Sequence, residues 1–204
     1  MRYGMVIDLR RCIGCNACSL ACKQENSTGP GIFWSRTIVS EKGRYPKARM
    51  DYLPLLCMHC ENAPCVKACP TGATGKMENG TVVVDQNKCI GCRACMIACP
   101  YDARSMALKA TPYHGEKGFT AFEEASKDDH QEGTVEKCNF CADRVKAGQK
   151  PACVLTCTTR ARIFGDLDDP GSEVSKLIAA RDGYQLQPQH GTEPSVFYLP
   201  YGDE

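Results

Sequence analysis

The chain lacks long apolar runs and carries almost no net charge. Its 25 lysines and arginines nearly balance 24 aspartates and glutamates, so the formal net charge is +1. This balance gives no sign of a nucleic-acid-binding surface. No apolar stretch approaches the roughly 20 residues of a membrane helix, so the chain itself is not expected to span a bilayer. A strand expected at residues 3–7 leaves no room for an amino-terminal signal peptide.

Aromatic residues are also scarce, at 7% of the 204 residues, with a single tryptophan, Trp34. Hydrophobic residues amount to 43% with cysteine included, which is modest material for a core. Trp34 fits core packing at least as well as an interface. The sequence offers neither an open metal position nor a nucleophile with a matching base, so the chain is not expected to be catalytic by itself.

Cysteine, by contrast, is abundant. The 16 cysteines fall into four groups of four, and none is left over. The groups are Cys12, Cys15, Cys18 and Cys22; Cys57, Cys60, Cys65 and Cys69; Cys89, Cys92, Cys95 and Cys99; and Cys138, Cys141, Cys153 and Cys157.

Two of these groups have the spacing of bacterial ferredoxins. The first and third read C-x2-C-x2-C-x3-C, a run in which three thiolates hold one 4Fe-4S cubane and the fourth reaches a second cubane. The second, C-x2-C-x4-C-x3-C, and the fourth, C-x2-C-x11-C-x3-C, lengthen only the middle of the run. Proline follows Cys69 and Cys99, as in ferredoxins, whereas Lys23 and Thr158 follow the other two groups. Four thiolates per cubane predict four 4Fe-4S clusters.

Disulfides and zinc explain the pattern less well. Disulfide scaffolds are usually short, secreted chains. Zinc sites prefer two separated C-x2-C pairs or mixed cysteine and histidine ligands, which the ferredoxin runs do not resemble. Because the free energy of metal binding can become free energy of folding, the clusters are expected to substitute for much of the core.

The first and third groups also share their flanking sequence. Residues 6–8, Val-Ile-Asp, correspond to residues 83–85, Val-Val-Asp, and both groups begin Cys-Ile-Gly-Cys. The pattern predicts a strand, a tight ligand loop and a short alanine-rich helix that carries the fourth cysteine. Gly14 and Gly91 are expected to let backbone amides approach cluster sulfides, since glycine leaves no side chain in the way. The repeat indicates a duplicated ferredoxin module.

We therefore predict an α+β fold of duplicated bacterial-type ferredoxin-like modules, each with two 4Fe-4S clusters, with an inserted hairpin and loops. Residues 32–40 and 49–56 predict the hairpin, and residues 109–137 predict a surface loop with one short helix. The elements expected after the last cysteine are a strand at residues 162–164, a helix capped by Ser172 that ends near residue 180, and a terminal strand at residues 196–198.

Several motifs beyond the cysteines are shared with a known family. They are Met5-Val6-Ile7-Asp8, Cys57-Met58-His59-Cys60-Glu61-Asn62-Ala63-Pro64-Cys65, Cys69-Pro70-Thr71-Gly72-Ala73, Cys99-Pro100-Tyr101-Asp102-Ala103, Lys137-Cys138-Asn139-Phe140-Cys141, Gly165-Asp166-Leu167-Asp168-Asp169-Pro170, Gly191-Thr192 and Phe197-Tyr198. With these motifs the whole chain resembles the four-cluster electron-transfer subunits of the dimethyl sulfoxide reductase superfamily, particularly the small subunits of polysulfide, thiosulfate and respiratory arsenate reductases. Thr158 departs from family members whose fourth group ends in Cys-Pro.

The resemblance implies which groups pair, namely the first with the fourth and the second with the third. Spacing alone admits equally the pairing of first with second and third with fourth. The implied layout is a single unit over residues 1–204, made of two interleaved modules, 1–28 with 134–170 and 53–108. A hairpin insertion at 29–52, a loop insertion at 109–133 and a carboxy-terminal extension at 171–204 complete it. The implied ligand sets are Cys12, Cys15, Cys18 and Cys157; Cys22, Cys138, Cys141 and Cys153; Cys57, Cys60, Cys65 and Cys99; and Cys69, Cys89, Cys92 and Cys95.

The resemblance also implies a non-catalytic subunit of an anaerobic respiratory complex that relays single electrons along four clusters. The cluster held mainly by the first group would lie nearest a large catalytic subunit with a molybdenum or tungsten bis-pterin, acting on polysulfide, thiosulfate or arsenate. The cluster held mainly by the second group would face a membrane quinol-oxidising subunit, a cytochrome or another donor. The alternative is a polyferredoxin subunit of a hydrogenase or formate dehydrogenase, or a free carrier.

Location is expected to follow the catalytic partner. Family members without a signal peptide are often exported with a partner that carries a twin-arginine signal. A periplasmic location is therefore expected, with cytoplasmic retention as the alternative.

Four polar residues near the cysteines have two possible roles each. His59 is expected to form a structural hydrogen bond with the backbone rather than to respond to pH, because four cysteines already satisfy each metal site. Lys23, Arg93 and Arg104 either stabilise reduced clusters by offsetting negative charge or are solvated surface charges.

Overall fold

The computed structural model describes residues 1–126 and 128–201. Lys127, in the predicted loop insertion, and residues 202–204, at the end of the predicted extension, lie outside the described residues. The strands are β1 (Tyr3–Asp8), β2 (Arg36–Lys42), β3 (Arg49–Leu55), β4 (Thr74–Lys76), β5 (Val82–Val84), β6 (Ser105–Met106), β7 (Val135–Glu136), β8 (Arg162–Asp166) and β9 (Val196–Leu199). The helices are α1 (Ala17–Glu25), α2 (Pro64–Lys67), α3 (Ala94–Ile97), α4 (Ala121–Ser126), α5 (Ala142–Lys146), α6 (Ala152–Leu155) and α7 (Glu173–Ala180), with 3-10 helices η1 (Gly115–Lys117) and η2 (Pro188–His190). The predicted α+β class is confirmed.

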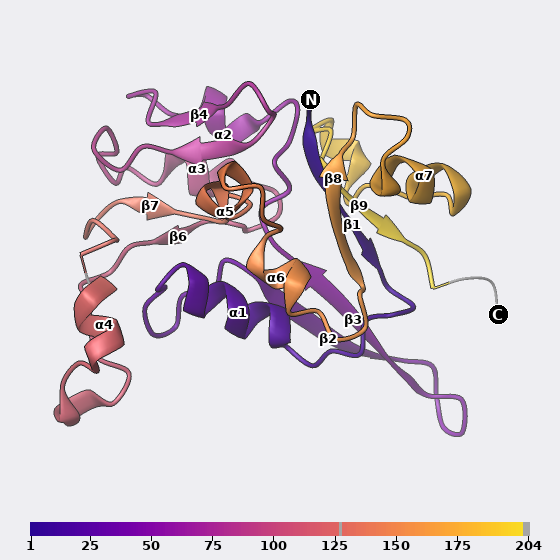
Figure 1. Cartoon of the computed structure of the whole chain (residues 1–204), viewed down its shortest axis with the longest axis horizontal. Helices are drawn as coiled ribbons and strands as arrows, with labels where there is room; N and C mark the ends of the chain where they lie inside the picture. The colour runs from indigo at the N-terminus through magenta and orange to yellow at the C-terminus, as the bar shows by residue number, and fades with distance from the viewer. Residues whose placement is uncertain (127, 202–204) are drawn as a thin grey trace.

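The strands connect the four cysteine groups in a ring. Each group is preceded in the chain by one strand, here called the entering strand, and followed by another, the leaving strand. The leaving strand pairs antiparallel with the strand that enters the next group: β2 with β3, β4 with β5, and β6 with β7. The ring closes where β8, after the fourth group, pairs antiparallel with β1, before the first (Figure 1). The first and fourth groups are thereby neighbours, although they are farthest apart in the sequence.

The carboxy-terminal segment completes the sheet at this closure. β9 pairs in parallel with β1 and gives a three-stranded sheet in the order β8-β1-β9. Helix α7 packs on the sheet, and the Ser172 side chain caps it by accepting a hydrogen bond from the Ser175 amide at 3.2 Å. The strands and the helix expected after the last cysteine are thus confirmed. The buried residues that join helix and sheet are Val6, Ile163, Val174 and Leu199.

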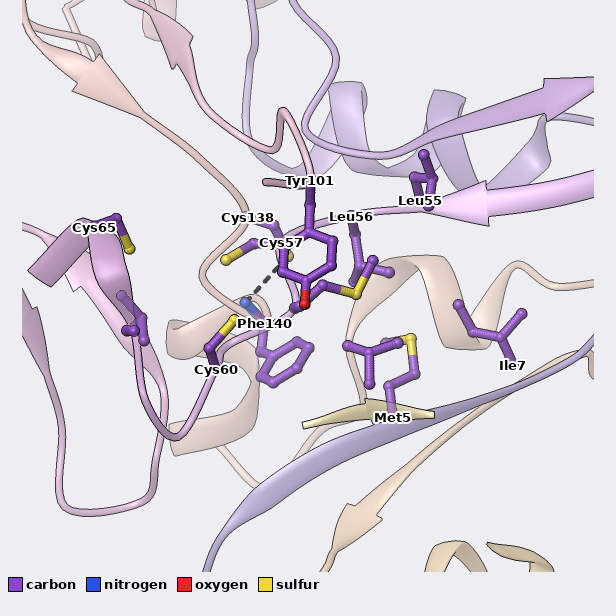
Figure 2. Packing of buried hydrophobic residues seen from close by; sticks show 14 of the residues in the cluster. Met5, Ile7, Leu55, Leu56, Cys57, Cys60, Cys65, Tyr101, Cys138 and Phe140 are labelled. Atoms are coloured by element: carbon purple, nitrogen blue, oxygen red, sulfur yellow. Dashed lines mark hydrogen bonds between the residues drawn. The ribbon is translucent and has the colours of Figure 1, made fainter. Parts of the chain in front are cut away.

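Cysteines form a large part of the main core. Figure 2 shows the sulfur atoms of Cys57, Cys60 and Cys138 among Leu56 and Phe140. The Phe140 amide donates a hydrogen bond to the Cys138 sulfur at 3.5 Å. Thiols therefore occupy positions that aliphatic side chains fill in most domains of this size.

The helices end at different points relative to the fourth cysteine. Helix α1 carries Cys22, the fourth cysteine of the first group, as predicted, and continues to Glu25. The expectation is wrong for the third group, because α3 ends at Ile97, before Cys99. The same early end occurs in the second and fourth groups, where α2 ends at Lys67 and α6 ends at Leu155. Thr158 follows the last cysteine of the fourth group, so proline is not required for the early end.

The two segments predicted to be insertions contain the elements expected for them. β2 and β3 form a hairpin, and Arg36 at its base donates through Nη1 to the Asp102 carbonyl at 2.8 Å. The segment 109–133 contains η1 and α4, and its Tyr113 hydroxyl donates to the Thr28 carbonyl at 2.7 Å. Among residues 1–126 and 128–201, no helix has the length and apolar character that crossing a membrane requires.

Candidate iron-sulfur centres

Helices α1 and α6 bring the first and fourth cysteine groups together. α1 carries Cys18 and Cys22, and it packs against α6, which carries Cys153. Burial raises the pKa of Cys22 to about 12, and Cys153 acts in the same direction. Burial also raises the pKa of Cys12, with contributions from Cys18 and Cys157. Thiols of the two groups therefore share one electrostatic environment.

Helices α2 and α3 do the same for the second and third groups. α2 carries Cys65, α3 carries Cys95, and the two helices pack against each other. Burial raises the pKa of Cys60 to about 12, with Cys57 and Cys99 acting in the same direction. Cys99, from the third group, thus lies among the thiols of the second.

Two small cavities are lined by cysteines from different groups. Each combines three cysteines of one group with the last cysteine of another. The lining residues include Cys22, Cys138, Cys141 and Cys153 with Trp34 in the first cavity, and Cys57, Cys60, Cys65 and Cys99 with Arg104 in the second. The remaining two expected ligand sets lie nearer the surface, since they include the exposed Cys15 and Cys92.

Backbone amides point at several of the sulfurs. The Thr74 amide lies 3.4 Å from the Cys69 sulfur, and the Ala161 amide lies 3.1 Å from the Cys157 sulfur. Burial alone would raise the pKa of Cys69, but hydrogen bonds from Thr74 and Thr71 outweigh it and lower the pKa to about 7. The thiolate is the form that binds iron, so these amides favour the ligand state.

Three buried nitrogen atoms near the cysteines have no hydrogen-bond partner among the described residues. They are Nη1 of Arg162, Nη2 of Arg104 and Nε2 of His59. A buried donor without an acceptor is costly, and the sulfur atoms of a 4Fe-4S cluster accept hydrogen bonds. The thiols, the mixed cavities and these donors therefore fit iron-sulfur clusters.

The two repeated glycines meet different neighbours. Gly14 has a φ of +69° and Gly91 a φ of +67°, a region that favours glycine. A Cβ on Gly14 would overlap the Tyr52 ring, and a Cβ on Gly91 would overlap the Gly133 carbonyl oxygen. Close packing against the protein thus explains both glycines, and their approach to cluster sulfides stays a prediction.

His59 has the structural role expected of it. The ring is fully buried and stacks on Phe140 with centroids 3.7 Å apart. Its Nδ1 accepts a hydrogen bond from the Val82 amide at 3.1 Å, which confirms the backbone bond. Burial lowers the pKa of His59 well below its ordinary value, and Lys137 lowers it further, so the ring is neutral with its proton on Nε2.

The predicted tuning residues divide into three cases. Lys23 anchors the loop after α1, donating to the carbonyls of Gly29 at 2.9 Å and Ile32 at 2.7 Å. Arg93 is exposed at the start of α3. Arg104 is only 5% exposed and lies beside cysteines, so it is not a solvated surface charge.

Trp34 packs against the main core, which is one of the two roles that the sequence allows. Its Nε1 donates to Glu136 at 3.1 Å, and its ring meets His130 edge-on with centroids 5.8 Å apart. Trp34 also lines the cavity of Cys22 and Cys138.

Sequence reasoning missed Arg162, which is 3% exposed among the thiols of the first and fourth groups. A signal was present in the sequence. Arg162 stands five positions after Cys157, and Arg104 stands five positions after Cys99.

Comparisons with known proteins agree with the cysteine pattern. One family model, described as a 4Fe-4S dicluster domain, matches residues 48–114 and 123–167, and a second of the same description matches residues 11–73. The iron-sulfur subunit of the arsenate respiratory reductase of Shewanella sp. is 44% identical over 98% of this chain and 96% of the relative. One subunit of the tetrathionate reductase of Salmonella typhimurium is 42% identical over 99% of this chain and 74% of the relative. One subunit of the selenate reductase of Mesobacillus selenatarsenatis is 41% identical over 98% of this chain and 72% of the relative.

Proposed function

Because the chain belongs to the 4Fe-4S dicluster family of iron-sulfur subunits that serve reductases of the dimethyl sulfoxide reductase type, we propose that it relays single electrons through four 4Fe-4S clusters. Its role is electron transfer, and it is not the catalytic subunit. The number four rests on the 16 cysteines, at four thiolates per cubane. The observation that supports crossed ligation is the pair of mixed cavities, each lined by three cysteines of one group and one of another.

The proposed ligand sets pair the first group with the fourth and the second with the third. Packing of α1 against α6 and of α2 against α3 supports this pairing. The four sets are Cys12, Cys15, Cys18 and Cys157; Cys22, Cys138, Cys141 and Cys153; Cys57, Cys60, Cys65 and Cys99; and Cys69, Cys89, Cys92 and Cys95.

The same pairing supports two interleaved ferredoxin-like modules, residues 1–28 with 134–170 and residues 53–108. Strand pairs β8-β1 and β4-β5 would close each module on itself. Pairs β2-β3 and β6-β7 would link one module to the other. Both insertions, 29–52 and 109–133, lie at these links.

When bound, the clusters supply one-electron redox centres. The chain would hold them through cysteine thiolates and directs backbone amides at the sulfurs. The buried Phe140 ring and the partly buried Trp34 ring line one cavity and limit the access of water. Crossed ligation keeps the two clusters of each module close together, which favours transfer between them.

We propose a large catalytic partner with a molybdenum or tungsten bis-pterin, at the end nearest the first cysteine group. The names of the relatives, which are subunits of arsenate, tetrathionate and selenate reductases, support an oxyanion or another sulfur or arsenic compound as substrate. The second group would face a quinol- or cytochrome-type donor. A periplasmic location, reached by export with the partner, completes the proposal.

The experiment is anaerobic purification of the complex through a tag on this chain, followed by metal analysis. Four clusters require about 16 iron atoms per chain. Stoichiometric molybdenum or tungsten with additional iron is expected from the partner. Iron alone on an isolated chain would instead favour a polyferredoxin, and a clear shortfall of iron would contradict four clusters.

Paired substitutions test the ligand sets. Cys60→Ser and Cys99→Ser together are expected to cost one cluster, because both residues are assigned to it. Cys60→Ser with Cys92→Ser should cost two clusters. Equal iron loss in the two double variants would refute the assigned pairing.

A further inference from the structure

Each proposed module contains one buried arginine at an equivalent position. Arg104 follows Cys99 by five residues and immediately precedes β6, and Arg162 follows Cys157 by five residues and begins β8. Arg104 is 5% exposed and Arg162 is 3% exposed. Guanidinium groups are rarely buried without a partner, so both positions require an explanation.

Arg162 is buried near cysteines that are assigned to both proposed clusters of its module. Its Nη2 donates to the Ser35 hydroxyl at 3.0 Å, while Nη1 is buried with no partner among the described residues. Burial alone would lower the pKa of Arg162, but the neighbouring thiols of Cys153 and Cys18 outweigh it and raise the pKa. Cys153 and Cys18 belong to different proposed clusters, so one guanidinium faces both.

Arg104 repeats this arrangement in the other module. Its Nη1 donates to the Thr74 hydroxyl at 3.2 Å, and Nη2 is buried with no partner among the described residues. Burial would lower its pKa as well, but Cys65 and Cys95 raise it. These two cysteines again belong to different proposed clusters.

Within residues 1–126 and 128–201, neither arginine forms an ion pair with a carboxylate. In this part of the chain the arginines that pair with carboxylates are others, and the oxygen acceptors of Arg104 and Arg162 are neutral hydroxyls. An isolated buried charge is strongly unfavourable, so the counter-charge must come from the thiolates and the clusters that they hold. A cubane with four thiolate ligands is negative, and one-electron reduction adds a further negative charge. A fixed positive charge beside it stabilises the reduced form and raises the reduction potential.

We infer that Arg104 and Arg162 set the reduction potentials of the two cluster pairs, each guanidinium raising the potentials of both clusters in its own module. This inference rests on the proposed function, since it requires four clusters in two modules. It assigns Arg162 to the first and fourth cysteine groups and Arg104 to the second and third. The unpaired Nη1 of Arg162 and Nη2 of Arg104 donate to cluster sulfur.

The test is a redox titration of the anaerobically purified complex, followed by electron paramagnetic resonance of the reduced clusters. Arg162→Gln removes the charge but keeps a hydrogen-bond donor, and Arg162→Lys keeps the charge. The matched control is Arg160→Gln, an exposed arginine in the same loop. Arg104→Gln and Arg104→Lys form the parallel set, with the exposed Arg93→Gln as control. Iron per chain is measured for each variant.

Arg162→Gln is expected to lower the ratio of reduced to oxidised cluster at a fixed potential at least tenfold for two of the four one-electron steps. Tenfold corresponds to about 59 mV for a one-electron couple. Arg104→Gln should shift the other two steps, while the lysine variants and both controls stay within threefold of the wild type.

Several outcomes would overturn the inference. Potentials that do not move in glutamine variants with full iron would reject it and leave the proposed function intact. Loss of iron in both glutamine variants would show that the arginines retain clusters structurally, which also rejects it. If all four steps shifted in one variant, the assignment of one arginine to each module would be wrong. A wild-type complex without reducible clusters would overturn both this inference and the proposed function.

Discussion

Substituting Gly91 by alanine should displace the ligand loop of the third cysteine group. Gly91 lies between Cys89 and Cys92, has a φ of +67°, and would place an added Cβ onto the carbonyl oxygen of Gly133. The left-handed backbone costs a residue with a side chain about 1–2 kcal/mol. The overlap adds about 1–3 kcal/mol, as in other overpacked sites, because a backbone carbonyl cannot move as a flexible side chain can. We expect Gly91→Ala to lower the free energy of unfolding by about 2–5 kcal/mol.

Two other glycines separate these contributions. Gly72 has a φ of +65° but nothing within 4 Å of an added Cβ, so Gly72→Ala should cost only about 1–2 kcal/mol. Gly75 has ordinary backbone and open space, and Gly75→Ala should have little effect or stabilise by up to about 1 kcal/mol. The assay is anaerobic urea unfolding of the holoprotein, with iron per chain measured before unfolding. Only Gly91→Ala is expected to lose iron. If Gly91→Ala and Gly72→Ala unfold alike, the approach of Gly133 to the loop is refuted.

Three further substitutions test the packing around the sites. Tyr198→Phe removes the hydrogen bond from a fully buried hydroxyl to the Pro54 carbonyl at 2.7 Å. It should lower the free energy of unfolding in urea by about 1–3 kcal/mol. A free energy of unfolding equal to that of the wild type within error would mean that water replaces the bond. His130 Nδ1 lies 2.7 Å from a carboxylate oxygen of Glu136, and this hydrogen bond raises the pKa of His130. The pair therefore stabilises the fold fully below a pH of about 6.5, and this stabilisation is lost as the pH rises through the raised pKa. The free energy of unfolding of the wild type minus that of His130→Gln should therefore shrink with rising pH, and a constant difference would contradict a charged His130. Ser172→Ala should cost about 1 kcal/mol by removing the cap of α7, and it should leave iron content unchanged.

The sequence predicts the cysteine groups because the requirements of a ligand loop are local. A cubane needs thiolates at short, fixed spacings, and glycines such as Gly14 and Gly91 mark the tight turns between them. The sequence does not reveal that Gly91 is packed against Gly133, since that contact joins segments that are distant in the chain. The sequence also places the fourth cysteine of the third group in a helix, whereas α3 ends at Ile97.

The order of the strands could not be predicted in the same way. β6 and β7 are two residues long, and the pattern of so short a strand carries almost no information about its partner. Arg162 was missed for a related reason. Arginine is usually a surface residue, even where a strand is predicted, and only the equal offset of Arg104 and Arg162 from their cysteines indicated otherwise.

The ring of strands and the buried arginines lead to one account of how the modules are built. Arg162 begins β8 and Arg104 immediately precedes β6, so each arginine marks the start of the strand that leaves the second run of its proposed module. β8 returns to its own module by pairing with β1, whereas β6 crosses to the other module by pairing with β7. The positions of the charges are therefore equivalent although the strand pairings that follow them are not. If the two proposed modules arose by duplication, a charge kept at the same step while the connections around it differ is expected when its function concerns the clusters and not the connections.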